Sequence, residues 1–102
     1  MQKIEAPFGH IEILEGTNEV GISILVIYPG REIKPHFHKK TREIEVILDG
    51  ELESKERKLK KGEIMIWEVN TVHGYKNNAN KNARVLCITI PPYNESDVFE
   101  VK

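Results

Sequence analysis

The sequence predicts an all-β protein, folded as a sandwich or barrel of short strands. Segments rich in Ile and Val recur at short intervals along the 102 residues, and β-branched clusters of this length suit strands better than helices. No segment shows a sustained 3.6-residue apolar period with a cap at each end, so no helix is expected. The expected strands are Ile11–Leu14, Val20–Tyr28, Ile44–Leu48, Ile64–Trp67 and Arg84–Ile90.

Turn residues separate these strands. Pro29-Gly30, Asp49-Gly50 and Lys61-Gly62 supply Gly and Asp where the chain must reverse, because these residues tolerate positive φ. The charged run 51–61 lies between two expected strands, and we interpret it as a solvated hairpin. The tail 91–102 begins with two prolines and is expected to form an edge strand or to reach a partner subunit.

Composition limits the class of protein. A chain of 102 residues is expected to form one domain, 1–102, and its net charge of -1 provides no basic field for nucleic acid. No run approaches the roughly 20 apolar residues of a membrane span, and the segment Met1–Gly16 lacks a signal-peptide pattern. The single cysteine, Cys87, cannot form an internal disulfide and is expected to be buried and inert. We therefore expect a cytoplasmic protein with neither nucleic-acid nor membrane partners.

Three of the four histidines form a candidate metal site. His36 and His38 are two residues apart, so on a strand they project from the same face. Glu43 follows at the start of an expected strand and offers a carboxylate, while His73 arrives from a later strand. Three imidazoles and one carboxylate suit a divalent transition metal ion, Fe, Mn, Zn, Ni, Co or Cu. Two half-exposed strand histidines without a metal are the alternative, and His10 is expected at the surface.

The spacing of these residues resembles the first motif of the cupin family, G-x5-H-x-H-x(3 or 4)-E-x6-G. Gly30, His36, His38, Glu43 and Gly50 occupy its positions and match every one.

The second cupin motif, G-x5-P-x-G-x2-H-x3-N, is matched in part. Gly62, His73 and Asn77 match, whereas Glu68 stands at the proline and Asn70 at the glycine. Asparagine adopts positive φ more readily than other non-glycine residues, so we expect the turn before His73 to survive. The two motifs cover residues 30–77, and the flanks match only in being strand-like.

The resemblance implies a cupin-type jelly-roll β-barrel of two antiparallel sheets, with a metal in an interior pocket. It assigns the ligand roles to His36, His38, Glu43 and His73. We expect a metal-dependent enzyme, dioxygenase-like, that acts on a small molecule. The alternatives are a metal-dependent isomerase or decarboxylase and a small-molecule-binding or sensing protein without catalysis, because the fold does not choose among them. Cupins commonly form dimers, so a homodimer is expected, with the apolar tail around Phe99 as a candidate surface.

Strand alternation extends the candidate site. If Glu43 points inward, Glu45 and Ile47 do so too, and Phe37 faces away from the metal. Glu45 is a candidate catalytic residue, as a general base, as a group that orients a ligand histidine or as a charge that repels anionic substrates. The alternative is a carboxylate that faces solvent or pairs with a lysine. Basic residues crowd the first motif and would draw an anionic substrate, unless they are ordinary solvated charges. They are Arg31, Lys34, Lys39, Lys40 and Arg42.

Overall fold

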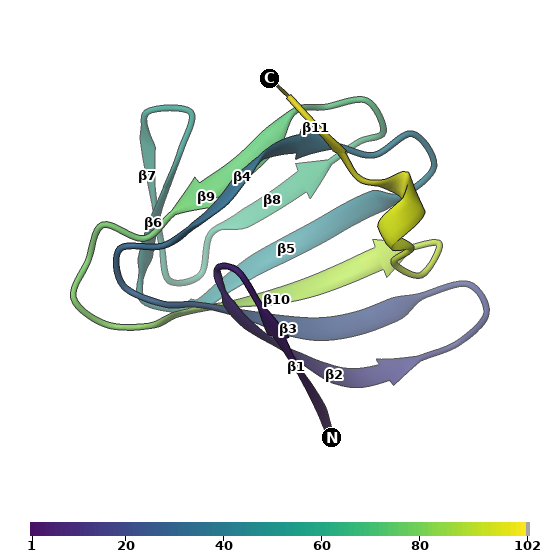
Figure 1. Ribbon diagram of the computed structural model, residues 1–102, viewed down its shortest axis with the longest axis horizontal. Coiled ribbons are helices and arrows are strands. Elements are labelled where there is room, and N and C mark those ends of the chain that lie inside the picture. The colour runs from purple at the N-terminus through teal and green to yellow at the C-terminus, as the bar shows by residue number, and fades with distance from the viewer. Residues whose placement is uncertain (102) are drawn as a thin grey trace.

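The computed structural model describes residues 1–101 and consists of two antiparallel sheets that face each other (Figure 1). The six-stranded sheet has the order β1 (Gln2–Ala6), β2 (Gly9–Gly16), β3 (Gly21–Ile27), β10 (Ala83–Ile90), β5 (Arg42–Asp49), β8 (Ile64–Trp67). The five-stranded sheet has the order β11 (Phe99–Glu100), β4 (Glu32–Phe37), β9 (His73–Lys76), β6 (Glu51–Ser54), β7 (Arg57–Lys60). This arrangement confirms the predicted jelly-roll class. Among the described strands the two sheets stay separate, so the barrel is not closed by hydrogen bonds.

Every strand expected from Ile and Val clusters is present, with ends shifted by a few residues. The short strands of the second sheet were harder to predict, because their sequences are polar and their pairing is with distant segments. Strand β4, for example, contains Lys34 and Pro35 and pairs with β9, about 40 residues later. A register shift between Ile33 and His36 accompanies that proline, which has no main-chain N–H to donate.

The hydrophobic core lies between the sheets. It consists of Ile27, Ile47, Leu52, Leu59, Met65, Tyr75, Ala83 and Val85. Two of these come from the charged run, which does form the predicted hairpin, β6–β7. The expectation that this hairpin is wholly solvated is wrong, because Leu52 and Leu59 lie opposite each other and are only 1% and 2% exposed. A single buried pair gives the charged hairpin its inner face.

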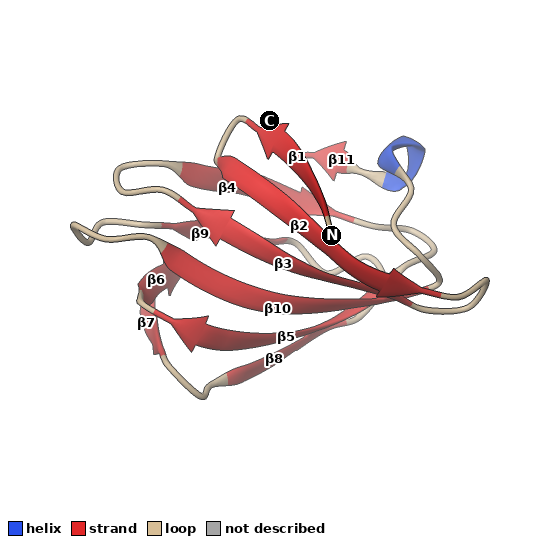
Figure 2. Cartoon of the chain, turned by 90° about the horizontal axis from the view of Figure 1, so that it is seen from below, coloured by secondary structure: helices blue, strands red, loops and turns tan. Residues whose placement is uncertain are grey.

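The six-stranded sheet has a buried inner face and an apolar outer face. On β5 the side chains of Glu43, Glu45 and Ile47 are buried inside, as strand alternation predicted. The outer face, which Figure 2 views across β3, β10, β5 and β8, also carries aliphatic side chains. Its paired rows are Ile66, Ile44, Ile88, Ile22 and Ile64, Val46, Leu86, Ile24. We refer to these eight residues as the outer apolar face.

Positive φ appears where the sequence required it. Asn70, which stands at a glycine position of the second motif, has a φ of 64°, so the exchange keeps the turn as predicted. Its main-chain N–H donates to the carbonyl of His38 at 2.7 Å. Gly50 has a φ of 84°, and a Cβ there would lie 2.8 Å from the Cα of Ala83. The turn at Asn70 thus holds the loop before His73 against His38.

The tail forms the predicted edge strand. Strand β11 pairs with β4, and Phe99 stacks on Phe37 with ring centres 5.4 Å apart. Phe37 therefore faces away from the histidine cluster, as expected. Before β11, the 3-10 turn η1 (Glu95–Asp97) crosses the end of the sandwich. Lys102, the last residue of the predicted tail, lies outside the described residues.

His10 corrects an expectation from the sequence. It is buried rather than at the surface, because its strand β2 is paired on both sides, by β1 and by β3. Its Nδ1 lies 2.8 Å from the hydroxyl of Tyr28 and its Nε2 2.9 Å from a carboxylate oxygen of Glu12. It lies outside the cluster formed by the other three histidines. Within residues 1–101 we found no helix with the length and hydrophobicity needed to cross a bilayer.

Candidate metal centre

Four side chains from three segments meet at one end of the interior. His36 is on β4 and lies opposite His73 on β9 in the strand pairing, His38 follows the end of β4, and Glu43 is on β5 of the facing sheet. One candidate ligand atom from each of the four residues lies within 4.8 Å of all the others. The structure thus brings together all four residues that the sequence singled out.

Each imidazole is held by a main-chain carbonyl. The Nδ1 atoms of His36, His38 and His73 lie 2.7, 2.9 and 3.0 Å from the carbonyl oxygens of Lys34, Asp97 and Thr71. A carbonyl oxygen can only accept, so each Nδ1 carries the proton and donates it. In a neutral ring the lone pair then lies on Nε2. This hydrogen-bonding pattern is the one found behind metal-bound histidines.

The Nε2 atoms converge on the carboxylate of Glu43. His73 Nε2 lies 2.7 Å and His38 Nε2 3.1 Å from the same oxygen, Oε1. The second contact is close but poorly directed, and the buried His38 Nε2 has no hydrogen-bond partner. A buried ring nitrogen without a partner is rare and points to a missing ligand. The donor set therefore fits a divalent transition metal ion that would be held by His36, His38, Glu43 and His73.

Electrostatics keep Glu43 ionised. Burial by itself would raise the pKa of Glu43, but its contacts with His38 and His73 outweigh burial and hold the pKa well below its ordinary value. Burial lowers the pKa of His36, whereas the contact with Glu43 raises the pKa of His38. The cluster thus contains a permanent carboxylate and an imidazole, His36, that favours its neutral form.

Asp97 anchors the loop that carries His38. Its main-chain carbonyl accepts from His38, and its buried carboxylate accepts from the main-chain N–H groups of Lys39, Lys40 and Thr41 at 3.0–3.1 Å. Burial opposes ionisation, but these donors hold the pKa of Asp97 below its usual range. Sequence reasoning missed this residue. The one local signal was Asn94, whose side chain caps the 3-10 turn that presents Asp97.

Glu45 is the centre of a second buried network, deeper in the sandwich. It is 1% exposed, and its Oε1 accepts from the indole N–H of Trp67 at 2.8 Å and from the hydroxyl of Tyr75 at 2.6 Å. Trp67 in turn stacks on His73, with ring centres 4.9 Å apart and ring planes 6° apart. The sequence indicated that Glu45 points inward. Nothing in it indicated that Trp67 would connect Glu45 to a candidate ligand.

The surroundings of Glu45 favour its neutral, protonated form, whereas the surroundings of Glu43 favour its charged form. Burial, followed by the charge of Glu43, raises the pKa of Glu45 to about 6. Cys87 lies beside both carboxylates, and burial raises the pKa of its thiol. Glu43, Glu45 and Cys87 are close enough to hold an ion, but a protonated thiol is a poor ligand. The set with three histidines is the better metal site.

Three of the basic residues of the first motif are engaged with other groups. Arg42 forms an ion pair with Glu68, with its Nε 2.7 Å from Oε1. The Arg31 guanidinium lies over the ring of Tyr28 and the Lys39 ammonium over that of Phe99, at 5.2 and 4.5 Å from the ring centres. These contacts favour the interpretation of these three as surface charges over that of a ring of cations around the pocket.

Comparison with known proteins identifies the fold. The sequence model of the cupin domain matches residues 23–89. KdgF from Halomonas sp. has a TM-score of 0.82 at 18% identity, covering 94% of this chain and 91% of that one. An RmlC-like cupin from Shewanella frigidimarina has a TM-score of 0.83 at 13% identity, covering 93% and 87%. Oxalate decarboxylase from Lactobacillus farciminis, solved as a formate complex, has a TM-score of 0.80 at 16% identity, covering 98% and 33%. At these identities the likeness shows the fold alone, and a search of curated proteins found no match.

The Glu45 network yields a stability prediction. Glu45→Ala leaves the buried Tyr75 hydroxyl without an acceptor and leaves the Trp67 indole N–H only its 3.0 Å contact with that hydroxyl, so we expect it to lower the free energy of unfolding by about 2 kcal/mol. Trp67 is the single tryptophan, so its emission should shift as well. Urea unfolding followed by fluorescence measures both effects. Glu45→Gln keeps the accepting oxygen and should remain close to wild type; equal losses in the two variants would contradict the assigned hydrogen bonds.

Proposed function

Because this chain belongs to the cupin domain family, we propose that it binds one divalent transition metal ion through His36, His38, Glu43 and His73. The observation that carries the proposal is the set of three Nδ1 hydrogen bonds to main-chain carbonyls, which leaves the Nε2 atoms of His38 and His73 against one carboxylate, with His36 in the same cluster. The unpartnered Nε2 of buried His38 supports it independently. The donor set admits Fe, Mn, Zn, Ni, Co or Cu.

We further propose that the protein is a metal-dependent enzyme, dioxygenase-like, that acts on a small molecule. An ion with four protein donors out of six positions would supply two positions for small ligands, and with them Lewis-acid or redox chemistry. The residues of the chain act around that position. Glu43 provides the negative charge, and the stack of Trp67 on His73 shields one face of that imidazole from water.

Within this proposal Glu45 has a positioning role rather than that of a general base. Its Oε1 is already occupied by the donors of Trp67 and Tyr75, and it is fully enclosed. It therefore acts on the candidate centre through Trp67, whose orientation sets the stacking on His73. This is one of the three roles that the sequence left open for Glu45.

The metal site can be tested without knowing the substrate. Untagged protein titrated with Co²⁺ should bind one ion and gain stability, by about 2.7 kcal/mol when the free ion is at 100 times its dissociation constant. Substituting a residue that hydrogen-bonds a metal ligand typically lowers metal affinity by roughly 10- to 100-fold. His36→Ala and His73→Ala each remove a ligand itself, so each should weaken Co²⁺ binding by more than that. Visible absorption of bound Co²⁺ measures the affinity.

His10→Ala is the matched control, because His10 is buried in contact with Tyr28 and Glu12, outside the cluster. It should leave Co²⁺ affinity unchanged. If His36→Ala binds Co²⁺ as well as wild type does, these histidines are not the ligands.

The reaction class is tested by dioxygen uptake. Protein loaded with Fe²⁺ under anaerobic conditions should consume dioxygen on exposure to a suitable small molecule, and His36→Ala should not. An oxygen electrode and a panel of small organic acids and sugars are sufficient for this measurement. Turnover without dioxygen consumption would favour the alternative of an isomerase or decarboxylase. Ligand binding without any turnover would leave a binding or sensing role.

We also propose a homodimer through the outer apolar face. The face of a sheet that is exposed to water normally carries polar residues. Here Ile64 and Ile66 on β8 are 64% and 56% exposed, and they lie beside the paired aliphatic rows of β5 and β10. At one end of this face the rim carries Arg42 and Glu68, one charge of each sign. Two copies of the outer apolar face would bring apolar surfaces together, and the charges of Arg42 and Glu68 at this rim cancel. We therefore favour self-association over a charged partner.

The dimer is tested by the mass in solution. Wild type should have twice the monomer mass by light scattering at micromolar concentration. The double variant Ile64→Lys, Ile66→Lys should be monomeric, because it places two charges in the face, while folding should be retained since both positions are exposed. Tyr93→Lys, an exposed apolar position outside the face, should remain a dimer. A monomeric wild type would refute the proposal.

A further inference from the structure

A cavity of about 340 Å³ lies beside His73. Strands β4, β6 and β9 and the turn between β6 and β7 line it, and its walls include His73, Tyr75, Ser54 and Lys55. Its volume falls in the range of small-molecule pockets. The cavity therefore shares one wall, at His73, with the candidate metal centre.

Ser54 forms part of one wall of the cavity. It lies at the end of β6, paired with Arg57, so its position is fixed by the hairpin. Ser54 is only 7% exposed, and its Oγ is closed off from water. It therefore shapes the wall beside the turn and offers no hydrogen-bonding group to a ligand.

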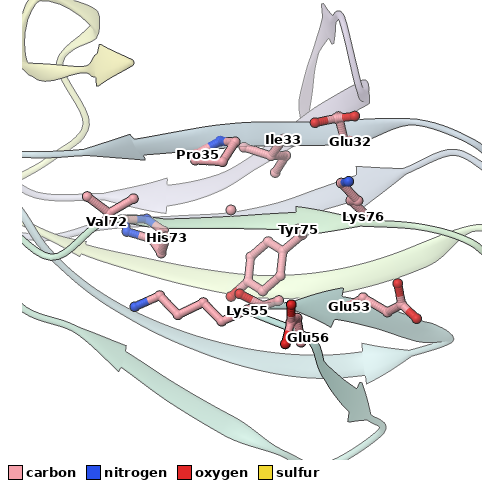
Figure 3. A pocket seen from close by; sticks show the side chains of 12 residues that line it. Glu32, Ile33, Pro35, Glu53, Lys55, Glu56, Val72, His73, Tyr75 and Lys76 are labelled. Carbon is pink, nitrogen blue, oxygen red and sulfur yellow. The ribbon is translucent and has the colours of Figure 1, made fainter. Parts of the chain in front are cut away.

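The hairpin turn directs a cation across the cavity. Lys55 and Glu56 are its two central residues, with φ of 52° and 63°. Two-residue turns of this kind usually contain Asn or Gly, because other residues adopt positive φ less readily. In Figure 3 the Lys55 side chain runs back across the cavity, with its ammonium on the side of His73. Its Nζ lies 5.7 Å from the ring centre of Trp67, the residue that stacks on His73.

The two ends of the cavity carry different charged groups. Figure 3 shows Glu32, Glu53 and Lys76 gathered at the end away from His73. Lys76 is the cross-strand neighbour of both glutamates, and Glu53 also accepts from the side chain of Asn78. The exposed Glu56 follows Lys55 in the turn. The cavity thus has a cation at the His73 end and carboxylates, which accept hydrogen bonds, toward the other end.

We propose that this cavity binds small hydroxycarboxylic acids. The carboxylate of the ligand pairs with the Lys55 ammonium at the His73 end, and its hydroxyl groups donate to the carboxylates at the other end. The proposal rests on the proposed function in one respect, since the carboxylate end is the one presented to the candidate metal. It also places anion recognition on Lys55, which lies outside the basic cluster of the first motif.

The experiment uses glycerate, with glycerol and propionate as matched probes that lack the carboxylate and the hydroxyls. Binding to the full-length chain is followed by amide chemical shifts at constant ionic strength, with EDTA present and again with Zn²⁺. Glycerate should shift the amides of Ser54, Lys55 and Gly74 in both states, and glycerol should bind more weakly. Lys55→Gln should weaken glycerate binding by about three- to tenfold, as expected for one partly exposed ion pair.

Two further variants separate the parts of the proposal. Glu53→Gln should reduce the preference for glycerate over propionate, and Lys60→Gln, an exposed lysine of the same hairpin that lies opposite Glu51, should change nothing. Glycerate binding that is unaffected by Lys55→Gln, or shifts that avoid residues 54–56 and 74, would overturn the proposal. Binding that depends on Lys55 with EDTA present, together with no uptake of Zn²⁺, would support the cavity while refuting the metal centre.

Discussion

The hydrogen bonds from three imidazole Nδ1 atoms to main-chain carbonyls are the constraint on which the site depends. A histidine ring can rotate and can carry its proton on either nitrogen, so three rings would ordinarily sample many arrangements. Here the carbonyls of Lys34, Thr71 and Asp97 fix the protonated nitrogen and the orientation together. Those carbonyls lie on β4, in the loop before β9 and in the 3-10 turn, so three parts of the fold must be in place at once.

The interior is divided between stability and chemistry. One end of the sandwich is a close-packed core around Ile47, Leu52 and Val85. The other end contains two carboxylates, Glu43 and Glu45, on adjacent inward positions of one strand. Burying two like charges so close together is unfavourable, and their surroundings resolve it in different ways. Glu43 remains charged among imidazoles, whereas the pKa of Glu45 rises to about 6 beside Trp67 and Tyr75.

Features set by local pattern could be predicted from the sequence, and features set by distant pairing could not. Strand alternation was enough to place Glu43, Glu45 and Ile47 inside, and the preference of asparagine for positive φ was enough for Asn70. The burial of Leu52 against Leu59 was missed because a charged run hides one apolar position in each strand. Asp97 and the stacking of Trp67 on His73 were missed because each joins segments whose spacing along the chain carries no signal.

The contact between His38 and Asp97 also orders events during biosynthesis. The two residues are 59 positions apart, and the ring of His38 is oriented only when the carbonyl of Asp97 is present. A nascent chain that has released both cupin motifs from the ribosome therefore still lacks one of the three carbonyls that orient the histidines. The interior cluster reaches its final geometry only after the 3-10 turn has been translated and has docked.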